Sequence, residues 1–284
     1  MIIWLASYPK SGNTWVRSFI SALYYHSEGE NDFSNLKKIK QFPTRSVFEN
    51  FTENTQDVVQ VYKNWINVQN FLNLDNQIKF LKTHHVNCII NNYKFTAVDE
   101  NSLGAIYIVR DPRNVLLSVK NHFSLSNYEN AKDFIFREKH WVGIEKTEKD
   151  KFEDNTIPTL ISSWNVHYKT WKNKTKNYLL IKYEDLQKDP QKEFLKITEY
   201  LEKITNTKFA KHKIQKAIET TSFSYMQKLE SEGFFNENAK SKSNTKVKFF
   251  NMGPKTKWQE YLSDEIIEEI NTKFKDEMIE LGYL

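Results

Sequence analysis

The sequence WLASYPKSGNTW, residues 4–15, predicts a strand, a loop and a helix in immediate succession. The apolar run from Ile2 to Ala6 has the length of a buried strand, and a turn that contains Pro9 and Gly12 follows it. After this turn the residues of a buried helix face recur at helical spacing, namely Thr14, Trp15, Val16, Phe19, Ile20 and Leu23. A chain that begins in this way is typical of α/β proteins.

The loop between strand and helix has the features of an anion site. A helix that starts directly after a buried strand exposes backbone N–H groups and the positive end of its dipole. We therefore expect Ser11, Gly12, Asn13 and Thr14 to surround a phosphate, with Lys10 adding a point charge. The spacing differs from the GxxxxGK[ST] loop of ATP- and GTP-binding proteins. An ordinary strand-to-helix turn capped by Thr14 is the alternative.

Three more apolar runs have the length of buried strands, at Ile78–Thr83, Ala105–Val109 and Tyr178–Tyr183. Helical patterns follow the second and the third, the latter at Pro190–Leu201. Strands that alternate with helices predict a P-loop-like, doubly wound α/β fold, in which helices flank a parallel sheet on both faces. Because no linker interrupts the chain, we expect a single domain over residues 1–284.

Other segments give weaker signals. Asp32–Leu74 and Tyr128–Trp171 are rich in Phe, Trp, Asn and Lys with weak periodicity, which predicts irregular helices that cover or line a cleft. Asn236–Lys248 is polar and basic, which predicts a mobile loop. A helical pattern returns from Asp264 to Leu281.

The composition excludes several classes of protein. The 41 Lys and Arg against 36 Asp and Glu give a net charge of +5 that is spread along the chain, which suits an anionic ligand and argues against a tail-driven nucleic-acid binder. The single cysteine, Cys88, rules out an intrachain disulfide and a cysteine-based zinc site. No segment approaches the ~20 apolar residues of a membrane span, and the N-terminus lacks the pattern of a signal peptide. These features predict a cytoplasmic protein.

The string YPKSGNTW, residues 8–15, resembles the 5'-phosphosulfate-binding loop of the cytosolic sulfotransferase family, usually YPKSGTTW, with Asn13 as the departure. Further similar segments follow in the family's order. They are Lys82-Thr83-His84, the stretch VRDPRNVLLS at residues 109–118, Ser163-Trp164, Tyr183-Glu184-Asp185 with Asp189-Pro190, and Thr221-Ser222-Phe223. The resemblance spans the chain from Trp4 to Trp258.

This resemblance implies transfer of a sulfuryl group from 3'-phosphoadenosine-5'-phosphosulfate (PAPS) to the hydroxyl or amine of a small-molecule acceptor. Lys10 would stabilise the leaving phosphate, work that a metal ion does in related chemistry, so no metal is expected. A neutral imidazole is well suited to take the acceptor's proton. Side chains alternate along a strand, so Lys82 and His84 face one way and Thr83 and His85 the other. The family pattern selects His84 as the base.

The resemblance also implies a nucleotide site. Arg110 and Ser118, eight residues apart, would hold the 3'-phosphate, and Ser118 would contact Lys10 as well. Trp15 and Phe223 would lie around the adenine, and the other residues of the nucleotide pocket would be Tyr183, Thr221 and Ser222. Taken singly, Arg110 can also be read as a surface residue paired with Asp111, and Ser118 can be read as a helical serine without a role in binding. Trp15 and Phe223 likewise suit the core.

The clearest departure lies in FFNMGPKTKW, residues 249–258, where the family usually has FxRKGxxGDW. Asn251 and Met252 stand in place of the Arg-Lys pair, so either Lys255 or Lys257 supplies the missing charge or binding of the 3'-phosphate is weaker. Gly253 still permits close backbone approach. The predicted nucleotide site therefore includes Asn251, Gly253 and Lys255.

Two other functions remain open at this point. A small-molecule kinase would place Lys10 on the phosphates of ATP, but it needs Mg²⁺ and a carboxylate to hold the metal. A catalytically inert nucleotide-binding protein would account for the altered residues 251–252, although Lys10, His84 and Ser118 are all retained. The sequence identifies neither the acceptor nor the oligomeric state.

Overall fold

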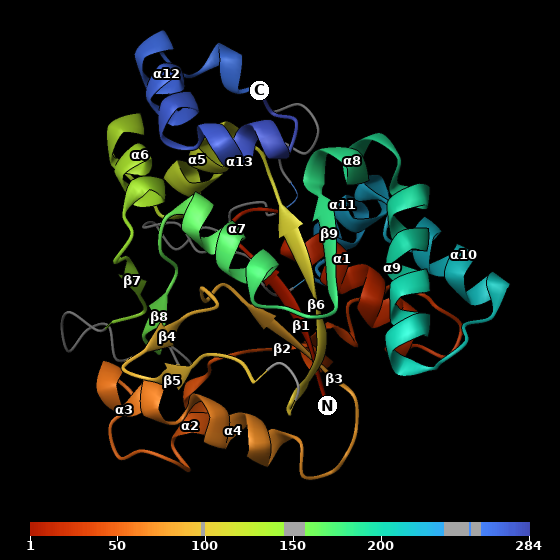
Figure 1. Cartoon of the computed structure of the whole chain (residues 1–284). Coiled ribbons are helices and arrows are strands. Elements are labelled where there is room, and N and C mark those ends of the chain that lie inside the picture. The colour runs from red at the N-terminus through yellow and green to blue at the C-terminus, as the bar shows by residue number, and fades with distance from the viewer. Residues whose placement is uncertain (98–99, 145–156, 236–249, 251–256) are drawn as a thin grey trace.

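The computed structural model describes residues 1–97, 100–144, 157–235, 250 and 257–284 (Figure 1). Its centre is a parallel five-stranded sheet in the spatial order β2-β3-β1-β6-β9, which confirms the predicted α/β fold. The strands are β1 (Ile2–Ser7), β2 (Lys40–Gln41), β3 (Lys79–Thr83), β6 (Ser102–Val109) and β9 (Tyr178–Lys182). The first strand of the chain thus lies in the middle, where neighbours on both sides bury it.

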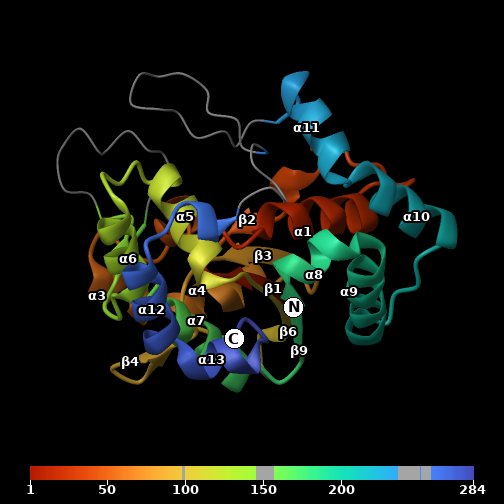
Figure 2. The same ribbon diagram turned by 90° about the horizontal axis from the view of Figure 1, so that it is seen from above.

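Helices cover both faces of the sheet (Figure 2). Side chains of β1 alternate between two cores, because Ile3 and Leu5 pack on one face and Trp4 and Ala6 on the other. The helices of the Leu5 face are α1 (Asn13–Ile20), α8 (Tyr183–Lys188), α9 (Pro190–Thr205), α10 (Lys211–Thr220) and α11 (Phe223–Ser231).

The opposite face carries the core around Trp4, which joins Trp65, Trp164 and Trp171 among the largest fully buried side chains. Its helices are α2 (Arg45–Phe48), α3 (Val58–Lys63), α4 (Trp65–Leu72), α5 (Pro112–His122), α6 (Tyr128–Phe136), α7 (Trp164–Asn173), α12 (Asp264–Lys273) and α13 (Lys275–Glu280).

The remaining elements are short. Two antiparallel pairs lie outside the main sheet, formed by β4 (Ile89–Ile90) with β5 (Tyr93–Lys94) and by β7 (Trp141–Val142) with β8 (Thr159–Leu160). A π-helical turn η1 (Ser21–Tyr25) extends α1, and two 3-10 turns occur at η2 (Leu36–Lys38) and η5 (Trp258–Glu260). No helix in the ranges that the structure describes is long and apolar enough to cross a lipid bilayer.

Several predicted boundaries differ from the structure. The strand predicted to end at Tyr183 ends at Lys182, because Tyr183 starts α8 and its ring packs beneath a guanidinium. The C-terminal helix is interrupted at Phe274, a fully buried ring that packs against Phe136 and Trp164. Thr14 does not cap α1, since the N-cap is Gly12 in a left-handed conformation with φ of 98°.

The two segments predicted as irregular helices differ from each other. Asp32–Leu74 contains short helical pieces, the longest of them α4. Tyr128–Trp171 instead holds the regular helix α6 and most of α7, which bury their apolar faces in the core around Trp4. The predicted loop at Asn236–Lys248 lies outside the described residues.

Candidate active site

The loop after β1 lies at the carboxyl edge of the sheet, where the arrowhead of β6 also points (Figure 1). Lys10 and Gly12 both have positive φ, 69° and 98°, so the loop turns sharply before α1. A Cβ atom on Gly12 would lie 2.4 Å from Cδ2 of Tyr183, which only glycine avoids. In the described part of the chain, no side chain caps the α1 N-terminus. The N–H of Trp15 donates to the Gly12 oxygen at 3.0 Å, and the helix N-terminus in front of it suits an anion.

Arg110 connects several of the predicted site residues. Its Nη1 donates to the backbone oxygen of Lys10 at 3.2 Å and to Oγ of Ser118 at 3.1 Å. Its guanidinium carbon lies 4.3 Å from the ring centroid of Tyr183. Nε of Arg110 and Oγ of Ser11 are buried and have no hydrogen-bond partner within the described ranges. Such orphaned groups fit a site that is completed by a polar ligand.

The predicted aromatic residues also lie together. The ring of Trp15 packs edge-on against Tyr183 at 6.0 Å and against Phe223 at 6.4 Å. Its indole Nε1 donates to the backbone oxygen of Thr221 at 2.7 Å, while Ser222 precedes α11 as its N-cap. This group is continuous with the guanidinium of Arg110 through Tyr183 and forms an aromatic wall beside the loop.

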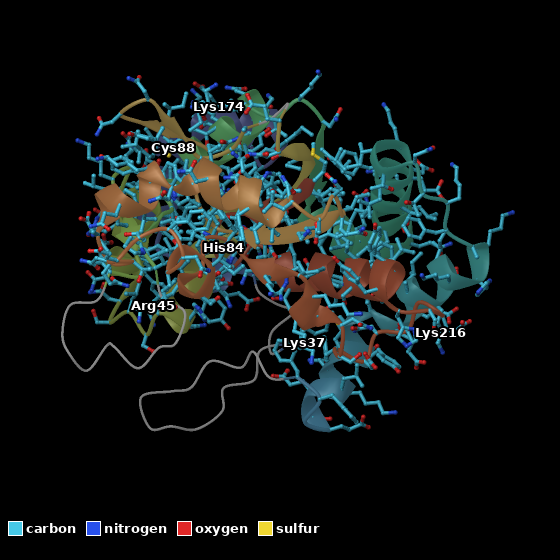
Figure 3. All side chains as sticks on the ribbon, turned by 90° about the horizontal axis from the view of Figure 1, so that it is seen from below. Lys37, Arg45, His84, Cys88, Lys174 and Lys216 are labelled. Carbon is cyan, nitrogen blue, oxygen red and sulfur yellow. The ribbon has the colours of Figure 1, made fainter. Side chains whose placement is uncertain are left out.

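His84 follows the last residue of β3 and lies near the middle of the molecule, whereas Lys216 on α10 lies at its edge (Figure 3). Nδ1 of His84 is 2.8 Å from the backbone oxygen of Ser7 and 3.3 Å from its Oγ. A carbonyl oxygen only accepts, so Nδ1 carries the hydrogen and Nε2 keeps its lone pair. That tautomer is the one that a general base acting through Nε2 requires.

A second histidine holds the backbone of the first. Nε2 of His167 donates to the backbone oxygen of His84 at 3.1 Å, and Nδ1 of His167 accepts from the Tyr107 hydroxyl at 2.8 Å. His167 is fully buried, and burial lowers its pKa to about 3. It therefore remains neutral and keeps the donor and acceptor roles that this chain of bonds needs.

His85 has different surroundings from His84. Its ring stacks on Phe95 with 4.1 Å between the ring centroids and an interplanar angle of 6°, and it meets Trp65 edge-to-face with 4.7 Å between the centroids. Nδ1 donates to the backbone oxygen of Val86 at 2.7 Å. His85 thus belongs to the aromatic core on the other side of the strand, as side-chain alternation predicts.

Burial shifts the pKa values of two ionisable groups in the site. Burial lowers the pKa of Lys10 to about 8, and the neighbouring charge of Arg110 adds to this effect. Burial also lowers the pKa of His84 well below its ordinary value, with a further contribution from the Lys82 charge. At neutral pH the site therefore holds a neutral imidazole beside protonated lysines.

Two residues that the sequence left unassigned belong to this environment. Lys82 acts electrostatically on His84, and the alternation of β3 already placed it on that side. His122 ends α5, four residues after Ser118; although its side chain is exposed, partial desolvation and then the charges of Lys10 and Lys82 lower its pKa. The spacing of Ser118 and His122, one helical turn, is the signal that would have found it.

The predicted role of Asn13 uses its backbone N–H, and its side chain makes a separate set of hydrogen bonds. Its Nδ2 donates to the backbone oxygen of Leu5 at 3.0 Å and to Oγ of Ser7 at 3.2 Å. The side chain thus faces the end of β1, and only its backbone N–H remains for a phosphate. Asn251, Gly253 and Lys255 lie outside the described residues, which include no group of three or more His, Cys, Asp or Glu suited to a metal ion.

Comparison with known proteins gives a consistent result. A family model described as "Sulfotransferase domain" matches residues 2–282. Rat sulfotransferase 1E1 is 25% identical over 226 residues, an alignment that covers 78% of this chain and 65% of the rat protein. Cytosolic sulfotransferase 13 of Arabidopsis thaliana is 24% identical over 282 residues, covering 97% of this chain and 76% of that protein.

A solved structure shares the fold. Retinol dehydratase, crystallised with androsterone and the inactive cofactor PAP, superimposes with a TM-score of 0.58 at 17% sequence identity. The superposition covers 98% of this chain and 80% of that one.

Proposed function

The chain belongs to the sulfotransferase domain family, and we propose that it moves a sulfuryl group from PAPS to a hydroxyl or amine of a small-molecule acceptor. The observation that carries this proposal is the position of His84 relative to the loop. Its imidazole is bonded to Ser7, three residues before Lys10. The candidate base and the candidate cation for the leaving group are therefore held by one short segment.

We assign the nucleotide to the loop and the aromatic wall. The N–H groups of residues 11–14 and the ammonium of Lys10 would hold the 5'-phosphosulfate, and Arg110 with Ser118 the 3'-phosphate. Trp15, Tyr183 and Phe223 would surround the adenine, next to Thr221 and Ser222. The bonds that Arg110 makes to the Lys10 backbone oxygen and to Ser118 support a nucleotide site in which the two phosphate positions adjoin. For residues 251, 253 and 255 the assignment rests on the sequence alone.

His84 and Lys10 then have complementary tasks. As the acceptor oxygen forms its bond to sulfur and the bond from sulfur to the phosphate oxygen breaks, Nε2 of His84 takes the acceptor's proton. Nδ1–H stays on the Ser7 oxygen and orients the imidazolium that forms. Lys10 neutralises the charge that develops on the departing phosphate. The products are the sulfated acceptor and adenosine 3',5'-bisphosphate (PAP).

The wider assignments follow from the family. We propose that residues 1–284 act as one domain and that the acceptor is a small molecule, since the structural neighbour retinol dehydratase holds androsterone and PAP. We also propose a cytoplasmic location, in keeping with the name of the Arabidopsis relative.

A transfer assay tests the function. Labelled PAPS is offered with a panel of phenols, hydroxylated metabolites and amines, and a labelled product is expected with at least one of them. Thermal unfolding with PAP is run beside thermal unfolding with ATP and Mg²⁺, because a ligand of the native state raises the midpoint. Stabilisation by ATP and Mg²⁺ alone, together with phosphorylated product, would instead establish the kinase. Binding of PAP without transfer to any acceptor in the panel would favour the inert protein.

Two variants test the roles within the site. Lys10→Ala is expected to remain folded and to lose most transfer, since leaving-group stabilisation contributes on the order of a few kcal/mol. His84→Ala is expected to lower kcat by roughly 10² to 10⁴ with unchanged PAP affinity. Near-wild-type turnover of either variant would remove that residue from the mechanism.

A further inference from the structure

The side chain of Asn13 is buried at the end of the central strand, with 5% of its surface exposed. Its Nδ2 is within hydrogen-bond distance of the Leu5 backbone oxygen and of Ser7 Oγ, and an amide NH₂ has the two hydrogens needed for both. Both hydrogens are thus directed at β1. None remains on Asn13 to donate to a bound phosphate from its side chain.

Ser7 in turn faces His84 with two atoms. Its backbone oxygen is 2.8 Å and its Oγ 3.3 Å from Nδ1 of the imidazole. Because Asn13 donates to the hydroxyl oxygen at 3.2 Å, it holds that oxygen beside the ring. Asn13, Ser7 and His84 therefore form one chain of hydrogen bonds, which runs from the helix after the phosphate loop to the imidazole.

We propose that Asn13 is a positioning residue for His84, and that it acts on proton transfer through Ser7 rather than on nucleotide binding through its own side chain. The proposal rests on the proposed function, in which His84 is the base. When His84 takes a proton, its Nδ1–H keeps the Ser7 carbonyl as its main acceptor, and the fixed hydroxyl oxygen beside it stabilises the new charge as a second acceptor. Loss of Asn13 frees that hydroxyl to rotate and loosens the imidazole.

The chemistry of the loop explains why an amide is suited to this position. Threonine, which the family usually has here, offers one hydroxyl on a shorter side chain and cannot donate to Leu5 and Ser7 together. The amide does both. Asn13 thus joins the start of α1 to the strand end that holds the base.

The principal test is a double-mutant cycle of Asn13→Ala and His84→Ala, with kcat measured across pH and PAP affinity measured by calorimetry. Asn13→Ala is expected to lower kcat roughly ten- to a hundredfold, the usual cost of a misplaced catalytic group, and to shift the pH profile. PAP affinity is expected to stay within twofold of wild type. In the His84→Ala background, Asn13→Ala should cause no further loss of kcat.

The matched control is Ser18→Ala on the same helix. Ser18 is fully buried, and its Oγ donates to the backbone oxygen of Thr14 at 2.8 Å, so this variant also removes one buried hydrogen bond from α1. It is expected to leave kcat, its pH profile and PAP affinity unchanged. Ser7→Ala removes the middle of the chain while sparing the backbone oxygen, and it replaces Asn13→Ala if that variant fails to fold.

Different outcomes separate this inference from the proposed function. A tenfold loss of PAP affinity in Asn13→Ala with kcat preserved would overturn the positioning role. The positioning role would also be overturned if the losses of kcat in the two single variants added up in the double variant. If His84→Ala keeps its activity, the base assignment fails instead, and the ¹⁵N shifts of the His84 ring then decide. The inference stands only if Asn13→Ala and Ser7→Ala change these shifts and Ser18→Ala does not.

Discussion

The Tyr283 hydroxyl donates to Oε2 of Glu184 at 2.8 Å, and the other oxygen of the same carboxylate accepts the backbone N–H of Asp111 at 3.0 Å. The pair joins the residues that follow β6 and β9, directly beside Arg110 and Tyr183 in the sequence. Burial raises the pKa of Glu184, so the two donors are what keep its carboxylate satisfied. The C-terminal tyrosine thereby stabilises two strand ends that carry predicted nucleotide contacts.

Tyr283→Phe is therefore expected to destabilise the fold by about 1–3 kcal/mol, the cost of removing a partner from a buried acceptor. PAP binding should weaken by a smaller factor, because Arg110 and Tyr183 lose part of their support. Urea unfolding and calorimetric titration measure the two effects. The control is Tyr261→Phe, since Tyr261 is exposed on 46% of its surface. Equal stability of both variants would show that the Glu184 bond contributes nothing.

Binding of PAP should take up a proton near pH 8. The pKa of Lys10 is lowered to about 8 by burial and by Arg110, so above that pH a growing fraction of the free protein carries a neutral amine. A bound phosphate favours the ammonium form and raises the pKa again. Titrations at pH 8.5 in two buffers of different ionisation enthalpy measure the uptake.

Lys10→Arg is the matched variant for that experiment, since a guanidinium stays protonated throughout this range. The wild-type protein is expected to take up a fraction of a proton per PAP bound and Lys10→Arg close to none. The same uptake in both proteins would place the titrating group elsewhere.

Buried histidines should make the fold sensitive to acid. Burial lowers the pKa of His85 from 6.5 to about 3, so the unfolded chain binds a proton below pH 6.5 that the folded protein refuses. The contribution of neutral His85 to the free energy of unfolding is therefore fully present above pH 6.5 and is lost as the pH falls toward 3. At pH 5 the loss from this group amounts to roughly 1–2 kcal/mol. His85→Phe, which keeps a flat ring against Phe95, should reduce the difference in unfolding free energy between pH 7 and pH 5. If the unfolding free energy of His85→Phe fell with pH in parallel with that of the wild-type protein, this prediction would be contradicted.

The sequence predicted those parts of the site that depend on local pattern. An apolar run and a turn were enough to find β1, the loop and α1, and the family resemblance, which includes the eight-residue spacing, paired Arg110 with Ser118. Side-chain alternation separated His84 from His85. Each of these relationships joins residues within one strand, or a strand and the helix that follows it.

Other features depend on contacts between distant segments and have no local signal. Tyr183 starts a helix although its neighbours continue a strand pattern, because its ring packs between Gly12 and the guanidinium of Arg110. The direction of the Asn13 side chain depends on its bond to Ser7 across the turn. The backbone N–H groups at a helix start predicted Asn13 at the phosphate, but neither that pattern nor a motif records side-chain directions.

Gly12→Ala provides the sharpest test of the packing between the loop and Tyr183. Two effects act on this variant, namely the φ of 98° and the 2.4 Å approach of the new Cβ to Cδ2 of Tyr183. An alanine at Gly233 has the first effect without the second, because φ there is 87° and nothing lies within 4 Å of an added Cβ. Gly233→Ala should therefore cost only the backbone strain, about 1 kcal/mol. Gly12→Ala should cost a further 1–3 kcal/mol, roughly the cost of overpacking, and should weaken PAP binding at least tenfold because Tyr183 is displaced. Urea unfolding and calorimetry on both variants give the difference. If the two alanine variants were equally stable and bound PAP equally well, the close packing of Gly12 on Tyr183 would have no part in forming the nucleotide site.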